Sequence, residues 1–95
     1  MRVEIADLGT WGGAWLVAEY DSEDDAIRVN ARAVARVRAA LGDAEAERFI
    51  ACAIAHERFH RERPDASEQD ARAAAQRACG VEPARFENAL RSSRA

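Results

Sequence analysis

The sequence predicts a small α+β domain in which a short β-hairpin-based sheet packs on three to four helices. Between residues 2 and 30, two segments alternate apolar with polar residues, and a third, at 14–20, is rich in aromatic and branched residues; both patterns are typical of strands. After residue 30 the apolar residues recur at helical spacing, and capping residues, glycines and a proline divide them into segments. The 95 residues show no repeat and no linker, so we expect one domain over residues 1–95.

Three short strands are expected in the first third of the chain. Val3 and Ile5 alternate with charged residues, and Ile27 and Val29 do the same on one face of a later segment. A polar stretch of hairpin length precedes that later segment. The expected strands cover residues 3–5, 14–20 and 26–30, with a glycine-rich loop at 9–13 and a turn at 21–25.

The first helix is expected from Asn30, as its cap, through Leu41, with Gly42 ending it. Its apolar stripe consists of Val34, Val37, Ala40 and Leu41. Asp43 is expected to cap a second helix that runs to about Arg63, because the following proline disfavours helical backbone at the residue before it.

Two further helices complete the expected fold. Asp65 or Ser67 opens the third helix, which continues through Cys79 and is closed by a glycine. Pro83 suits the first turn of a short final helix, because its missing N–H has no partner there in any helix. Phe86 and Leu90 are expected to face inward from this last helix.

The composition excludes several classes of protein. Hydrophobic residues make up 48% and charged residues 33%, the balance of a soluble globular chain. The formal charge of −3 and the absence of a strongly basic half predict no nucleic-acid partner. The longest apolar run, residues 49–55, is too short to cross a membrane, and no apolar signal segment begins the chain. We therefore expect no membrane partner and a cytoplasmic location.

Cys52 and Cys79 are isolated in the sequence and do not form a ligand-like pair. Each lies in a helical pattern with apolar neighbours, where a small buried thiol is the usual role. We expect two buried thiols.

Residues 56–60 spell H-E-x-x-H and contain both histidines of the chain. On a helix, His56 and His60 stand on one face and can bind a single divalent metal, and Glu57 is placed to act as base on a metal-bound water. Residues 49, 53, 56 and 60 share one stripe, so the histidines should continue the buried face. Alternatives are ordinary histidines without metal, or a purely structural metal site.

Catalytic zinc normally takes three protein ligands, and no third histidine exists. A carboxylate must therefore complete the site. The turn at Pro64 reverses the chain and brings Glu68 opposite His60, which makes Glu68 the best candidate. The simpler interpretation is that Glu68 completes a capping box with Asp65. The reserve candidates are Asp65, Asp70, Glu82 and Glu87.

The segment 54–60 (IAHERFH), followed by residues 68–71 (EQDA), resembles the gluzincin metallopeptidases, which pair H-E-x-x-H with a downstream glutamate. The small size and the preceding hairpin are similar to the minigluzincins. This resemblance implies a zincin-like fold, Zn²⁺ as cofactor, His56, His60 and Glu68 as zinc ligands, and Glu57 as general base. It also implies peptide or protein substrates that can add as a strand at the rim of the cleft.

Three departures from that pattern weaken catalysis more than metal binding. Arg58 lies inside the motif, where a cation near a dication is unfavourable unless its side chain turns to solvent. Arg72 stands where such families often carry an aspartate that supports a histidine. No downstream tyrosine or histidine is present to stabilise an oxyanion, and Tyr20 is expected to pack at a strand end.

The rival hypothesis is a catalytically inactive zincin-like domain that serves as a regulatory or protein-interaction module. Trp11 and Trp15, beside the glycine-rich loop, would supply a partner-binding patch; the plainer interpretation is that Trp15 anchors the core. A third possibility is a helical adaptor with a chance motif. The sequence does not determine the oligomeric state.

Overall fold

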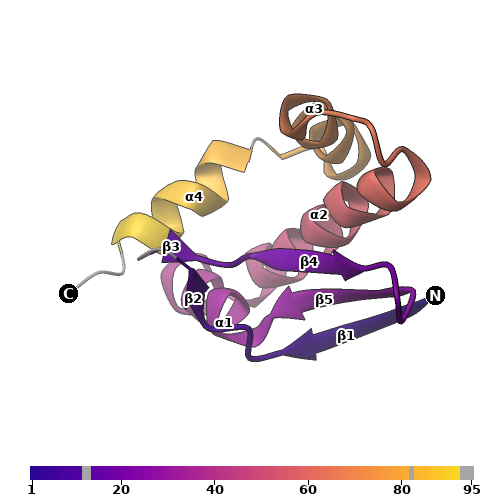
Figure 1. Cartoon of the computed structure of the whole chain (residues 1–95). Helices are drawn as coiled ribbons and strands as arrows, with labels where there is room; N and C mark the ends of the chain where they lie inside the picture. Colours follow the sequence, from indigo (N-terminus) through magenta and orange to yellow (C-terminus); the bar gives the residue numbers. More distant parts are fainter. Residues whose placement is uncertain (12–13, 82, 93–95) are drawn as a thin grey trace.

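Three strands form a mixed sheet that supports the helices (Figure 1). The computed structural model describes residues 1–11, 14–81 and 83–92, without the side chains of residues 10, 11, 14, 15, 83 and 92. In this part of the chain, four helices accompany the sheet. The helices are α1 (Ala31–Leu41), α2 (Asp43–Glu62), α3 (Glu68–Cys79) and α4 (Pro83–Ser92). The predicted α+β class is confirmed.

The sheet has the order β1-β5-β4, with β5 in the centre. The strands are β1 (Arg2–Ala6), β4 (Ala18–Asp21) and β5 (Ala26–Asn30). The expected hairpin is present, because β4 and β5 pair antiparallel across the turn. β1 pairs parallel with β5, which makes the sheet mixed rather than purely hairpin-built.

The single strand expected at 14–20 is wrong, because the structure divides it. Its first residues form β3 (Ala14–Trp15), which pairs with β2 (Thr10–Trp11) in a separate ribbon. Its last residues belong to β4. The predictions for the two tryptophan side chains and for the glycines at 12 and 13 lie outside the described residues.

Asn30 explains where that strand divides. Its side-chain Nδ2 donates to Leu16 O at 2.6 Å and to Gly9 O at 2.9 Å, and its Oδ1 accepts from Leu8 N at 3.2 Å. The same Oδ1 accepts from Arg32 N, which confirms the predicted cap of α1. One fully buried amide thus joins the end of β5, the start of α1 and the chain before β4.

The core lies between the sheet and the helices. α1 and α2 pack on β5, α3 packs chiefly on α2, and α4 packs on α1. Phe49 and Phe86 meet edge to face, with ring centroids 5.3 Å apart. Phe86 and Leu90 are buried as predicted, whereas Ala40, assigned to the buried stripe of α1, is exposed.

The helix boundaries correct one predicted cap. Gly42 is both the end of α1 and the cap of α2, and its backbone adopts a φ of 95° that favours glycine. Asp43 is therefore the first residue of α2 rather than its cap, and its carboxylate pairs with Arg38 at 3.0 Å. At the other end α2 finishes at Glu62, one residue before the position expected from Pro64.

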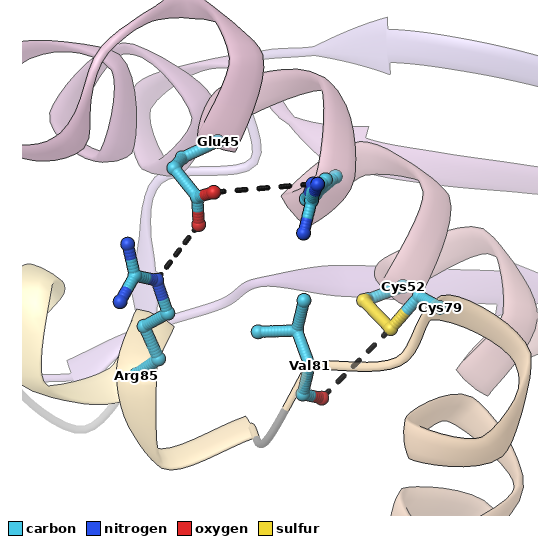
Figure 2. The surroundings of a disulfide bond; sticks show 6 residues. Glu45, Cys52, Cys79, Val81 and Arg85 are labelled. Atoms are coloured by element: carbon cyan, nitrogen blue, oxygen red, sulfur yellow. Dashed lines mark hydrogen bonds and ion pairs between the residues drawn. A yellow bond between two sulfur atoms is a disulfide. The ribbon is translucent and has the colours of Figure 1, made fainter.

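The prediction of two free thiols is wrong: Cys52 and Cys79 form a disulfide (Figure 2). The bond links the middle of α2 to the last residue of α3, across a Cα–Cα distance of 5.5 Å. Sequence reasoning treated each cysteine in its own helix. It missed that two antiparallel neighbouring helices bring positions 27 residues apart into contact.

None of the helices in the described part of the chain combines the length and the hydropathy needed to cross a bilayer.

Candidate metal centre

The H-E-x-x-H residues lie in the C-terminal half of α2, the helix in contact with α1, α3, β4 and β5. His56 and His60 are one helical turn apart, and their ring centroids are separated by 5.0 Å. The side chains of both histidines are 21% exposed. The histidines therefore sit at the border of the core, continuing the stripe of Phe49 and Ala53 as expected.

Glu68 reaches both histidines from the start of α3. Its Oε2 lies 3.1 Å from His56 Nε2, and its Oε1 lies 2.6 Å from His60 Nε2. The turn at Pro64 thus brings together the residues that sequence spacing predicted. The alternative of a capping box with Asp65 is wrong, because Ser67 caps α3 and its Oγ accepts from Asp70 N at 3.0 Å. Glu68 is the first residue of α3, which leaves its carboxylate available to the histidines.

His60 Nε2 is a buried nitrogen without a hydrogen-bond partner in the structure. Glu68 Oε1 lies 2.6 Å from this nitrogen, at ion-pair distance, but the two atoms do not form a hydrogen bond in the structure. Buried polar atoms are nearly always satisfied, so an orphaned one needs an explanation such as an ion.

The donor set fits a divalent metal. Ligand atoms of His56, His60 and Glu68 lie within 4.8 Å of one another, and this is the one such group found among the described residues. Two imidazole nitrogens and one carboxylate oxygen are a standard catalytic zinc set, with a fourth position for water. Donors around tetrahedral zinc lie roughly 3.4 Å apart, given metal–ligand bonds of about 2.0–2.1 Å. Small side-chain movements therefore suffice to accommodate the ion.

Glu57 lies next to this group but is not part of it. Its Oε2 is 3.9 Å from His56 Nε2, and its side chain is 14% exposed. Burial raises the pKa of the Glu57 carboxyl above its ordinary value, although the neighbouring histidines act in the opposite direction. A carboxyl with a raised pKa is better suited to accept and return a proton near neutral pH.

A cavity of about 420 Å³ adjoins the site. It follows α2 for about two turns, from Phe49 to Glu57, roughly 12 Å at 1.5 Å per residue. His56, Glu57 and Glu68 are among its polar lining residues. Its apolar wall is formed by Leu16, Val17, Phe49, Val81, Phe86 and Leu90.

The arginines around the motif turn away from the histidines or pair elsewhere. Arg58 is exposed on the opposite side of α2, so it does not place a cation at the site. Arg61 binds Asp25 in the β4–β5 turn, with Nε 2.7 Å from Oδ1. Arg72 lines the cavity and forms an ion pair with Glu87 of α4.

The reserve ligands are not brought into the cluster. Asp65 and Asp70 are exposed, and Glu87 is engaged by Arg72. Glu82 lies outside the described residues. Tyr20 Oη donates to Asp25 Oδ1 at 2.8 Å, so the tyrosine bonds within the hairpin rather than at the candidate metal centre.

Two features of the site escaped sequence reasoning. The Cys52–Cys79 disulfide lies in the cavity wall, one turn before His56 on α2. Arg72 and Glu87 meet across the same cavity from different helices. The sequence did contain a signal that Cys52 and Arg72 lie near the site. Cys52 is four residues before His56 and Arg72 is four residues after Glu68, and residues at this spacing share a helix face.

Comparison with known proteins gives no match to any protein-family model, any curated protein or any solved structure.

Proposed function

We propose that this chain is a zinc-dependent peptidase with a zincin-like fold resembling the minigluzincins. The observation that carries the proposal is the convergence of His56, His60 and Glu68, with an orphaned imidazole nitrogen at its centre and Glu57 beside it. A chance H-E-x-x-H gives no reason for a carboxylate from another helix to meet both rings.

In the proposed mechanism, His56, His60 and Glu68 hold the metal. Bound there, zinc supplies Lewis-acid chemistry that polarises a carbonyl and makes water more acidic. Glu57 accepts the proton of the attacking water on its carboxylate and passes it to the leaving amine. Its position supports this role, because Glu57 lies 3.9 Å from His56 Nε2, beside the proposed ligands but outside their group.

The surroundings of the site support a peptide as the substrate. β4 is an edge strand of the described sheet and packs against α2, and Ala18 of β4 lines the cavity. An extended peptide can add to such an edge through main-chain hydrogen bonds. The apolar wall beside the metal ligands favours a peptide with a large apolar side chain next to the scissile bond.

The first test is the metal content of purified protein. Native protein incubated with zinc and desalted should retain one equivalent, and His56→Ala should retain much less than one. Glu47→Gln is the control, because it changes an exposed carboxylate of α2 away from the cluster. Native protein that retains no stoichiometric zinc would contradict the proposal.

The second test separates binding from catalysis. Glu57→Ala should keep the zinc and lose cleavage of a mixed peptide library, whereas Glu62→Ala, at the exposed end of α2, should keep both. Undiminished cleavage by Glu57→Ala would exclude this residue as the base.

One observation favours the rival function of an inactive zincin-like interaction module. Tyr20, the single tyrosine, bonds to Asp25, and Arg72 bonds to Glu87, so neither is directed to an oxyanion. Zinc binding by native protein without cleavage of any library peptide would support this rival.

The cytoplasmic location, and the lack of nucleic-acid and membrane partners, stay predictions. The Cys52–Cys79 disulfide is the observation that counts against the cytoplasm, because such bonds persist mainly in oxidising compartments.

A further inference from the structure

β1 presents an exposed apolar row at an edge of the sheet. Met1, Val3 and Ile5 are 47%, 44% and 53% exposed, and they are the exposed large hydrophobic residues of the described chain. Val3 and Ile5 lie beside Ile27 and Val29 of β5, which are fully buried. The row therefore continues the core face of the sheet beyond the cover of the helices. Such an edge is a template for pairing with another strand.

The main-chain groups needed for pairing point outward at the apolar residues. Arg2 N donates to Asp25 O at 3.1 Å, so the N–H of Arg2 is directed toward β5. Along a strand these groups alternate in direction, which turns the N–H and C=O groups of Val3 and Ile5 toward the free edge.

The sequence of β1 is complementary to itself in one antiparallel register. With a two-fold axis at Val3, Val3 faces its own copy and Met1 faces Ile5, so the apolar row is continuous across the interface. On the other face of the sheet, away from the apolar row, Arg2 then faces Glu4 of the other copy. These charged pairs fall at the positions without hydrogen bonds, where opposed Cα atoms are closest, at about 4.5 Å.

We propose that two copies of this chain associate through β1, pairing antiparallel about an axis at Val3 to form one continuous sheet. This inference concerns a different edge from β4 and stands independently of the proposed peptidase function. A second copy is the occupant because it alone is certain to supply both the apolar row and the reversed order of charges.

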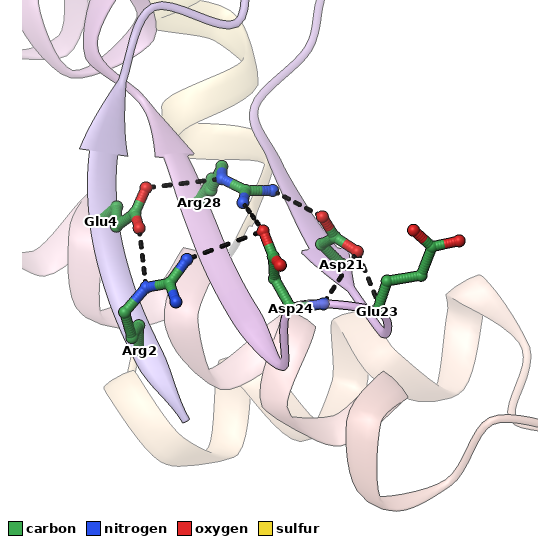
Figure 3. Close-up of polar contacts among 6 residues, drawn as sticks. All are labelled: Arg2, Glu4, Asp21, Glu23, Asp24 and Arg28. Atoms are coloured by element: carbon green, nitrogen blue, oxygen red, sulfur yellow. Dashed lines mark hydrogen bonds and ion pairs between the residues drawn. The ribbon is translucent and has the colours of Figure 1, made fainter.

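On the charged face of β1, Arg2 and Glu4 contact each other and charged residues of β5 and of the β4–β5 turn (Figure 3). Arg2 contacts Glu4 at 2.9 Å, and Glu4 also contacts Arg28 at 3.5 Å. Arg2 reaches Asp24 at 3.7 Å. These contacts hold Arg2 and Glu4 extended over the sheet with side chains 58% and 40% exposed, so each remains accessible to a partner.

The experiment measures mass in solution by sedimentation equilibrium over a range of concentrations. The native chain should shift from 10.4 kDa toward twice that mass as its concentration rises. Arg2→Glu alone opposes two glutamates in each pair, and Glu4→Arg alone opposes two arginines, so each variant should stay at the single-chain mass. A 1:1 mixture of the two variants restores opposite charges and should recover the double mass.

Glu47→Arg makes the same charge change as Glu4→Arg on the exposed face of α2; it is the matched control for that variant and should dimerise like the native chain. Circular dichroism of every variant verifies that the fold is retained. A native chain that keeps the single-chain mass throughout overturns the proposal. It is equally overturned if both charge variants dimerise as the native chain does, or if folded variants fail to recover the double mass when mixed.

Discussion

Two regions of the molecule, the end of β5 at Asn30 and the C-terminal half of α2 at His60, each bury polar side-chain atoms, but only those of Asn30 are hydrogen-bonded. Asn30 is fully buried, and both polar atoms of its side chain are hydrogen-bonded within the chain. His60 has a buried Nε2 that no described residue satisfies, although Glu68 Oε1 lies 2.6 Å away.

The difference distinguishes a structural group from a candidate functional one. An amide that joins three segments must be satisfied by the chain itself, because an unmade buried hydrogen bond is costly. A buried imidazole nitrogen without a hydrogen bond within the chain is instead a candidate to bind a ligand. Local violations of this kind are expected at functional sites.

The largest expected effect concerns how α3 holds Glu68 against the histidines. Replacing both Cys52 and Cys79 by alanine should lower the free energy of unfolding by about 3.5 kcal/mol, from the 27-residue separation that the bond closes. Zinc affinity should fall about tenfold, because α3 packs chiefly on α2 and loses its covalent tether. Urea unfolding and zinc titration measure the two effects; unchanged zinc affinity would show that packing alone positions Glu68.

Asn30→Ala tests the buried amide that is fully hydrogen-bonded. The change leaves Leu16 O, Gly9 O and Leu8 N without their partner and removes the cap of α1. The free energy of unfolding should fall by about 3 kcal/mol in urea titrations. A loss below about 1 kcal/mol would mean that water replaces the amide and that the region is less closed than its burial indicates.

His60→Leu tests the buried nitrogen that has no hydrogen bond. This variant should raise the free energy of unfolding, whereas Asn30→Ala should lower it. In chelator, this variant should be more stable than the native chain by about 1 kcal/mol, because it removes the orphaned nitrogen. With zinc, the native chain should gain stability and the variant should not. Glu68→Gln is the control that weakens zinc binding while keeping both rings. A metal-free His60→Leu protein less stable than native would assign His60 a structural role.

The smallest expected effect lies in the ion pair between the hairpin turn and the end of α2. Hydrogen bonds from Arg61 and then Tyr20 hold the pKa of Asp25 well below its ordinary value. A lowered folded-state pKa contributes stability above the ordinary pKa, near 3.9, and that stability is lost as pH falls below it. Arg61→Gln should therefore be less stable than native at pH 7, with a difference that shrinks below about pH 4. Arg77→Gln, at an exposed position of α3, is the control and should show no such pH dependence in thermal unfolding.

Local patterns in the sequence determined most of the secondary structure. The helical period of Val34 and Val37, the cap at Asn30 and the stop at Pro64 act over a few residues, so they predict α1 and α2 closely. The spacing of His56 and His60 predicted a shared helix face for the same reason. The turn after α2 was short enough for Glu68 to be proposed from the sequence as well.

Tertiary structure decided what depends on separate segments meeting. It divided the strand expected at 14–20, because buried Asn30 binds the chain at Leu16. It paired Cys52 with Cys79, and it joined β1 to β5 in parallel across more than 20 residues. It also partly buried Glu57 and left His60 Nε2 without a hydrogen bond. Burial and long-range pairing are properties of packed neighbours, and no local period in one segment encodes them.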